Sequence, residues 1–417
     1  MATVDAMGRK NANAVNVGEI CVGVALAALL LIGAWSPTRL SGELELAWWE
    51  EPRLWLALFL LTVALGFSAR RMQDGPRRAV RPAHSWFVTL TTALLLYTAL
   101  TAAWAPDGVL ALRKLREVVI IGLSFAGVLA SVEVLSPRMM TRVTWFTVSV
   151  LTLALALLAL PLSMEVGRVA VLGGGPNVFA RLMGFLFIAA LHGCVNTRYK
   201  IYWAIVAFGA AVLVVLSGSR GAMVAVCATF VAFLLIYRVS LRGALVAVAG
   251  GSVAVWMLVN FSPMGRVLQA VFQVRVLMLT AEKHYSSGRD VIYQQAWAMG
   301  LENVVRGSGL ASFNARYPDF VHPHNLFLEA FAEGGVIGCG LIVGVVCFGM
   351  RLALTGDCGR DHRNALGFGM ILIASQFSGQ LYDSRGLFIF PLLIAGWKNS
   401  VVQDPAGSMA GQLAVGG

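Results

Sequence analysis

Charged residues are scarce in this chain of 417 residues. Asp, Glu, Lys and Arg make up 13% of it, against about 25% in soluble globular domains. Because 58% of the residues are hydrophobic, this shortage excludes a soluble enzyme and a disordered chain. The six Cys are too few for a disulfide-bonded scaffold, and the sequence contains neither a His-Glu-x-x-His motif nor a Cys cluster for zinc.

The charges that are present are mostly basic. Lys and Arg number 32 against 21 Asp and Glu, which gives a net charge of +11. An excess of basic residues is typical of proteins that bind nucleic acid and of proteins that lie at a membrane surface. Here the basic residues separate apolar runs of roughly 20 residues, each long enough to cross a bilayer. The sequence therefore predicts an all-α integral membrane protein that binds no nucleic acid.

Apolar segments predict about 12 transmembrane helices. The first segment resembles the apolar region of a signal peptide, but it is too long for one, and we expect it to be retained as a helix. The expected segments are 18–36, 52–69, 85–104, 117–132, 143–163, 176–194, 201–217, 220–237, 243–260, 326–350, 364–382 and 385–401.

The positions of Lys and Arg predict the orientation. If both termini lie in the cytoplasm, the cytoplasmic segments hold seventeen Lys and Arg, and the short loops opposite hold eight. The positive-inside bias favours this arrangement. The eight are Arg39, Arg53, Arg113, Lys114, Arg116, Arg168, Arg220 and Arg385.

One connection is much longer than the others. We expect a tail over 1–16, transmembrane helices one to nine within 17–260, a loop domain over 261–325, helices ten to twelve within 326–401, and a tail over 402–417. Long insertions on one face usually carry function. The loop begins with an apolar stripe that includes Val267, Leu268 and Val271 and continues to Leu277, which predicts a helix lying in the membrane interface.

Polar residues at or inside the predicted spans gather on the side of this loop, which is the outer side in the predicted topology. Such residues are costly in a membrane and indicate a functional site. They are Arg168, Arg181, Glu329, Glu333, Gln376, Gln380, Asp383, Arg385 and the polar residues within segments 173–177, 217–221, 287–290 and 322–325.

Two Arg residues are predicted at helix N-termini. Ser219 precedes Arg220 at the start of a span as a plausible N-cap, and Ser287 and Asp290 match a capping pattern around Arg289. Backbone N–H groups, the helix dipole and the guanidinium fork together suit a phosphate or diphosphate. The alternative is that both Arg side chains anchor loops by pairing with Asp290 or Asp383.

His324 is the candidate base. It is followed by Asn325 and, on one face of the next helix, by Glu329 and Glu333. Further polar residues, Gln376, Gln380 and Asp383, are expected on one face of span eleven. These carboxylates and amides could hold the tautomer of His324 and accept its charge. A structural His, with interhelical hydrogen bonds for Glu333 and Gln376, is the alternative.

Two further features of the sequence each allow two interpretations. Glu43 and Glu45 form a Glu-x-Glu pair that could hold a divalent ion, but Glu50 and Glu51 follow, so a solvated acidic loop is preferred and no metal or cofactor is expected. The long loop is rich in aromatic residues. They suit stacking on sugars and equally suit an aromatic belt at the membrane interface.

Several short motifs resemble those of the O-antigen ligase and polymerase superfamily of bacterial envelope enzymes. They are Ser-Gly-Ser-Arg-Gly at 217–221, Ser-Gly-Arg at 287–289, Gly-Ser-Gly at 307–309, and His324-Asn325 with nine residues before Gly335 and then Gly338. The motifs cover about residues 160–350, and the layout of spans and loop covers the whole chain. The His-Asn-x9-Gly element is more similar to the ligase pattern.

The resemblance implies an inverting, metal-independent GT-C-type glycosyltransferase of the bacterial inner membrane with its site facing the periplasm. It implies that O-antigen polysaccharide moves from undecaprenyl diphosphate to a sugar hydroxyl of lipid A-core. Arg220 and Arg289 would hold the diphosphate, and His324 would assist deprotonation of the acceptor. The residues assigned to support or cavity are Arg168, Asn177, Arg181, His322, Asn325, Glu329 and Arg385.

Other functions remain open from the sequence. An O-antigen polymerase or a protein O-oligosaccharyltransferase would share the motifs, although polymerases tend to carry two large periplasmic loops and only one is predicted here. A transporter of lipid-linked glycans would place ionisable groups near the bilayer midplane and repeat its broken helices in two halves. His322 also stays a possible base beside His324.

Overall fold

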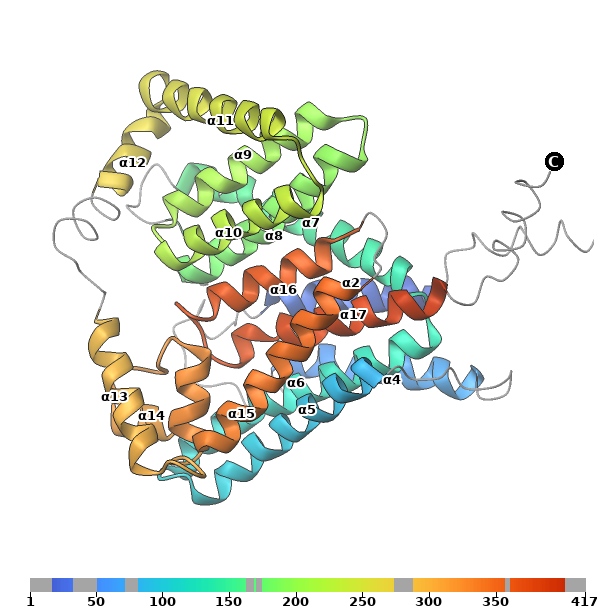
Figure 1. Ribbon diagram of the computed structural model, residues 1–417, viewed down its shortest axis with the longest axis vertical. Coiled ribbons are helices and arrows are strands. Elements are labelled where there is room, and N and C mark those ends of the chain that lie inside the picture. The colour runs from blue at the N-terminus through green and yellow to red at the C-terminus, as the bar shows by residue number, and fades with distance from the viewer. Residues whose placement is uncertain are drawn as a thin grey trace, which may run out of the picture.

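The computed structural model describes residues 17–32, 51–71, 82–162, 169, 175–273, 288–356 and 361–401. Within them every regular element is helical (Figure 1). Each of the twelve predicted segments contains a helix. These are α2 (Val17–Ile32), α4 (Pro52–Arg71), α5 (Pro82–Leu100), α6 (Gly108–Val134), α7 (Pro137–Leu162), α8 (Pro176–Asn196), α9 (Lys200–Leu216), α10 (Arg220–Ile236), α11 (Leu241–Phe261), α15 (Leu326–Thr355), α16 (Arg363–Ala374) and α17 (Gly386–Val401).

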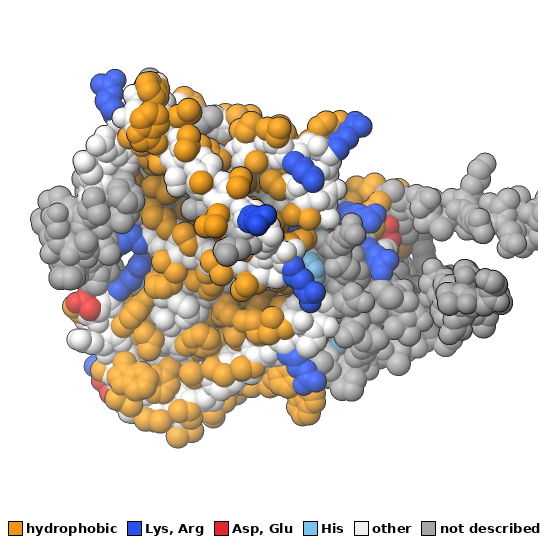
Figure 2. All heavy atoms as spheres, turned by 45° about the horizontal axis from the view of Figure 1, so that its top comes forward, with side chains coloured by type: hydrophobic (Ala, Val, Ile, Leu, Met, Phe, Trp, Pro, Cys, Tyr) orange, Lys and Arg blue, Asp and Glu red, His pale blue; other side chains and the backbone are white. Residues whose placement is uncertain are grey.

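Six of these helices are long and apolar enough to cross a membrane, namely α4, α5, α6, α7, α8 and α15. The other six contain shorter described apolar stretches of 10–17 residues, so twelve spans remain a prediction while an integral membrane protein is supported. Hydrophobic side chains cover most of the face seen in Figure 2, and most Lys and Arg on it lie toward its edges. An apolar outer surface of this kind suits contact with lipid.

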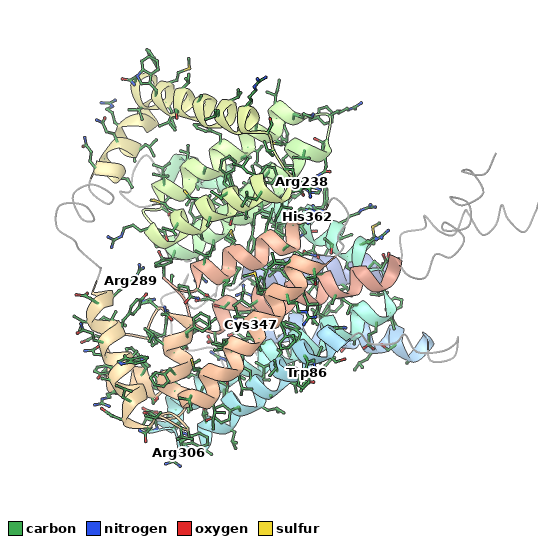
Figure 3. The ribbon with its side chains drawn as sticks, in the orientation of Figure 1. Trp86, Arg238, Arg289, Arg306, Cys347 and His362 are labelled. Atoms are coloured by element: carbon green, nitrogen blue, oxygen red, sulfur yellow. The ribbon has the colours of Figure 1, made fainter. Side chains whose placement is uncertain are left out.

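Helix α15 packs along α5, near Trp86 and Cys347 in Figure 3. Three glycines of α15 lie against α5. A Cβ on Gly334 or Gly338 would approach the Tyr97 ring, and one on Gly344 would lie 3.1 Å from Leu90. In contrast, nothing lies within 4 Å at Gly340. Three of the four glycines therefore allow the close approach of α5.

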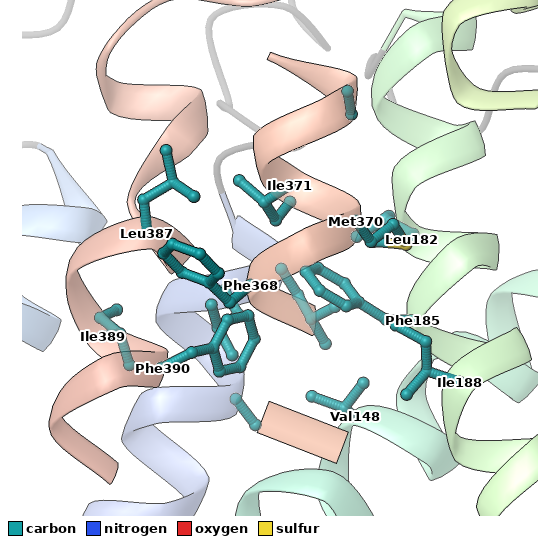
Figure 4. Close-up of a cluster of buried hydrophobic side chains, with 14 of the residues drawn as sticks. Val148, Leu182, Phe185, Ile188, Phe368, Met370, Ile371, Leu387, Ile389 and Phe390 are labelled. Carbon is teal, nitrogen blue, oxygen red and sulfur yellow. The ribbon is translucent and has the colours of Figure 1, made fainter. Parts of the chain in front are cut away.

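The centre of the bundle is an apolar cluster of α7, α8, α16 and α17 (Figure 4). The Phe390 ring lies 5.9 Å from that of Trp145 and 6.1 Å from that of Phe185. The buried indole N–H of Trp145 donates to Asn364 Oδ1 at 2.8 Å, and the Asn364 amide donates to Thr141 at 3.0 Å. Each polar group in this cluster thus has a partner, as burial requires.

Five short elements complete the fold. They are η2 (Thr101–Trp104), α12 (Pro263–Phe272), the pair α13 (Arg289–Glu302) and α14 (Ser312–Arg316), and η4 (Tyr382–Ser384). Helices α13 and α14 lie against the start of α15, at what we call the loop end of the bundle (Figure 1). The Phe313 side chain is fully buried there, in a cluster against which Tyr293, Tyr317 and Phe320 pack. These aromatic residues form a small core, which accounts for them without sugar stacking.

The predicted amphipathic helix at the start of the long loop is present as α12. Leu268 and Val271 are buried on its apolar face, and α12 contacts α9 and α11. Leu277, the end of the predicted stripe, lies outside the described residues. The location of α12 in a membrane interface stays a prediction.

Helix α15 is broken at Gly335, where φ is 62° and ψ is −159°. This region of backbone space is essentially restricted to glycine. Segment 303–309 fills the break. Its N–H groups at Ser308 and Gly309 donate to carbonyls of α15, and its carbonyls at Val304 and Val305 accept from the N–H groups that follow the break.

We predict that Gly335→Ala lowers the melting temperature of the protein in detergent. The new Cβ would lie 2.4 Å from the carbonyl oxygen of Val305, and the backbone strain alone costs about 1–3 kcal/mol. Gly340→Ala is the matched control, because it lies in regular helix with open space around it and should leave the melting temperature unchanged or raised. Equal melting temperatures for both variants would contradict this account.

Candidate functional site

One pocket is lined by both of the Arg residues that were predicted at helix N-termini, Arg220 and Arg289. Arg220 begins α10 and Arg289 begins α13. Figure 3 places Arg289 at the end of α13 that lies nearer α10. The pocket has a volume of about 530 Å³, and its remaining lining residues are Gly221, Val224, Asp290, Tyr293, Asn325, Gln376 and Phe377. Two helix starts from distant parts of the chain thus meet at one cavity.

The N-cap of α10 is the predicted residue, and that of α13 is not. Ser219 is the N-cap of α10, but its side chain makes no capping hydrogen bond; its N–H donates to Ser217 Oγ at 3.1 Å. The N-cap of α13 is Gly288, with φ of 72°, so the prediction of Ser287 as the cap is wrong. A left-handed turn that glycine tolerates replaces the side-chain cap.

The pocket holds two positive charges close together. Burial lowers the pKa of Arg289, and the charge of Arg220 lowers it further, while Tyr293 has the opposite effect. Both helix starts add positive dipole ends. An anion in the pocket would therefore relieve repulsion between the two guanidinium groups.

His324 lies directly before α15, in a left-handed conformation with φ of 60°. Burial lowers its pKa to about 4; the charges of His322 and Arg289 act in the same direction, and Glu329 and Asp383 oppose them. The imidazole is therefore neutral at neutral pH and able to accept a proton. The rings of His322 and His324 have centroids 4.3 Å apart.

Asn325 is the N-cap of α15. Its Oδ1 accepts from the N–H groups of Phe327 and Leu328 at 3.0 and 3.1 Å. Its amide donates to the carbonyl of Gln376, which also accepts from the Tyr293 hydroxyl at 2.8 Å. Asn325, which directly follows His324, thus connects the start of α15 to the wall of the pocket at Gln376.

Glu329 and Glu333 contact Lys114 rather than His324. The ammonium of Lys114 donates to Glu329 Oε1 and, at 2.8 Å, to both carboxylate oxygens of Glu333. Sequence reasoning counted Lys114 only as a loop charge, because the span was expected to begin at 117. Helix α6 instead begins at Gly108, where Asp107 caps it, and carries Lys114 into the bundle. The interhelical alternative for Glu333 is confirmed.

The prediction that Gln376, Gln380 and Asp383 share one face of span eleven is wrong. Helix α16 ends at Ala374, and these residues lie in the turns that connect it to α17. Gln380 donates to Glu117 Oε2 at 2.5 Å. The Arg181 side chain donates to the carbonyls of Ser378 and Asp383. The irregular backbone is thus supported by buried side chains.

Arg181, Arg385 and Asn177 do not line the Arg220 pocket. Arg385 donates to the carbonyls of Leu29 and Leu30 at 2.5 and 2.8 Å. With Arg181 and Asp383 it lines a smaller, separate cavity. Asn177 lies in the first turn of α8. Arg168 lies outside the described residues.

The described residues contain no group of three or more His, Cys, Asp or Glu arranged to hold a metal ion. Glu43 and Glu45, the pair weighed for a divalent ion, lie outside the described residues. The donor groups around the pocket are guanidinium, amide and hydroxyl groups with one carboxylate, Asp290. Such a set suits an anion better than a cation.

The chain was compared with known proteins and families. Among curated proteins, none matches it. A family model described as O-antigen ligase matches residues 204–343. This range runs from α9 to the middle of α15 and includes Arg220, Arg289 and His324. Residues 204–343 of this chain are therefore similar to the O-antigen ligase family.

Proposed function

We propose that the protein is an O-antigen ligase, which transfers O-antigen polysaccharide from undecaprenyl diphosphate to a sugar hydroxyl of lipid A-core. The observation that carries this proposal is the convergence of Arg220 and Arg289 on one pocket beside a neutral His324. The family match supports the class of reaction. It does not separate ligases from polymerases.

In the proposed reaction the diphosphate of the donor occupies the pocket. Two guanidinium groups and the starts of α10 and α13 face its oxygens with N–H donors. These fixed donors stabilise the negative charge that grows on the leaving group. Because Arg side chains supply this charge, we propose a metal-independent transfer.

His324 is proposed as the base. The acceptor hydroxyl attacks the anomeric carbon from the face opposite the diphosphate and passes its proton to the imidazole. The new bond joins the acceptor oxygen to that carbon, and the bond to the diphosphate oxygen breaks with its electron pair leaving on the phosphate. The anomeric configuration is inverted. The bound diphosphate also offsets the charge of Arg289, which raises the pKa of His324 toward that of an effective base.

The membrane arrangement is also a proposal. We infer an inner-membrane protein of the GT-C type with both termini in the cytoplasm, so that the loop end faces the periplasm. The apolar surface of the bundle would let both lipid substrates approach from the bilayer. A transporter is disfavoured because the pocket lies at one end of the bundle, where α10 and α13 begin.

The experiment that tests the proposal supplies purified protein in lipid nanodiscs with undecaprenyl diphosphate-linked glycan and lipid A-core. A glycan–lipid A-core conjugate is the expected product on a gel. A longer lipid-linked glycan would instead identify a polymerase, and glycosylation of an added acceptor protein would identify a protein O-oligosaccharyltransferase. Lack of all three products would overturn the proposed class of reaction.

We predict that Arg289→Ala raises the KM for the lipid-linked donor about 10- to 100-fold. A hydrogen bond to a charged group contributes about 1.5–3 kcal/mol, and about 1.4 kcal/mol corresponds to tenfold. Arg306→Ala is the matched control, since Arg306 is exposed in the same loop domain and lies against Trp104, away from the pocket. A similar KM in both variants would remove Arg289 from the donor site.

The two neighbouring histidines give a second comparison. We predict that His324→Gln lowers the turnover number by about 10²-fold or more, whereas His322→Gln lowers it by less than about tenfold. Both substitutions remove an imidazole from the same short segment, so effects on folding should be alike, and melting temperatures check this. The reverse order of effects would make His322 the base.

The pH dependence of kcat/KM follows from the pKa of His324. The base must be neutral, so activity is present above its pKa and lost as the pH falls through it. Since that pKa is about 4 in the free protein, we predict a flat kcat/KM between about pH 6 and about pH 8. A fall to half near the ordinary value of about 6.5 would show that burial, His322 and Arg289 do not control this imidazole.

A further inference from the structure

Lys114 uses all of its donors on two carboxylates. An ammonium group has three N–H bonds, and here they go to Glu329 Oε1, Glu333 Oε1 and Glu333 Oε2. Both oxygens of Glu333 are therefore engaged by Lys114. Glu329 is held by one oxygen alone.

The second oxygen of Glu329 is buried and available. Glu329 is 4% exposed, and among the described residues its Oε2 has no hydrogen-bond partner. The same is true of Nδ1 of His324. A buried polar atom without a partner costs about 1–3 kcal/mol. One of these atoms can donate a proton in a hydrogen bond, and the other can accept it.

Helix geometry assigns these two residues to a pair of positions whose side chains can reach each other. Because Asn325 is the N-cap of α15, His324 occupies the position before the cap and Glu329 occupies the fourth helical position. Side chains at these two positions pack against each other in the staple arrangement at helix N-termini. Here the pair is an imidazole and a carboxylate rather than two apolar groups.

We propose that Glu329 and Lys114 are positioning residues for the base: Glu329 Oε2 accepts a hydrogen bond from Nδ1–H of His324, and Lys114 holds the carboxylate in place. This inference rests on the proposed function and extends it. The hydrogen bond selects the tautomer in which Nε2 is free to take the proton of the acceptor hydroxyl. The carboxylate then stabilises the imidazolium that forms.

The charge of the cluster fits this role. One ammonium faces two carboxylates, so the group carries an excess negative charge that an imidazolium would balance. Lys114 also restricts Glu329, since a carboxylate held at one oxygen keeps its second oxygen in a defined position. Both carboxylate oxygens of Glu333 already accept hydrogen bonds from Lys114, so neither is left for an imidazole.

The experiment compares Glu329→Gln with Glu333→Gln in nanodiscs. Each variant removes one negative charge from the same cluster and keeps the size of the side chain. We expect Glu329→Gln to lower kcat by about 10²-fold with the donor KM changed less than about twofold, and Glu333→Gln to keep kcat within about threefold. Melting temperatures check that both variants are folded. Equal losses would assign both residues to structure and overturn the proposal.

A second variant tests Lys114. Lys114→Met combined with Glu333→Gln leaves Glu329 as the one carboxyl of the cluster and removes the group that holds it. We expect its kcat to fall well below that of Glu333→Gln alone, and an equal kcat would contradict a positioning role for Lys114. The ratio of each variant to the wild type is measured on whichever product the wild type forms, conjugate or longer lipid-linked glycan. The wild-type product thus tests the proposed function separately, and absence of any product would overturn both.

Discussion

The break in α15 at Gly335 and the backbone hydrogen bonds that fill it hold the loop end together. An unpaired N–H or C=O inside an apolar bundle costs several kcal/mol, so a broken helix survives there only if another segment supplies partners. Segment 303–309 does so on both sides of the break, and the Tyr97 hydroxyl donates to the carbonyl of Gly334 at 3.0 Å. Because this segment follows α13 directly, the hydrogen bonds also fix α13 and, at its far end, Arg289.

A second meeting point lies at the carbonyl of Gln376. Tyr293 of α13 and Asn325 at the start of α15 both donate to it, and the N–H of Leu326 donates to the neighbouring carbonyl of Ser375 at 3.1 Å. Three segments that are distant in the sequence are thus held at one wall of the pocket. Rigid placement matters because donors for a leaving group are effective only when they are positioned before the reaction.

The sequence was sufficient for features that depend on local chemistry. Each of the twelve predicted apolar runs contains a helix, and Arg220 and Arg289 do stand at the starts of helices. It was insufficient where tertiary contacts override the local pattern. The helical periodicity after Ala374 does not continue as helix, since Gly379 adopts a positive φ and Arg181 binds the carbonyls of the turn.

Composition and spacing alone determined that this is an apolar, helical chain with polar residues gathered near one long loop, because hydropathy and helix starts are properties of neighbouring residues. Only the tertiary structure decided which of those polar residues meet. Arg220 and Arg289 share a pocket, whereas Arg181 and Arg385 serve the turn and the end of α2. Lys114, inconspicuous in a run of loop charges, joins α6 to α15 through Glu329 and Glu333. Such pairings depend on how helices far apart in the chain pack, and no local pattern encodes them.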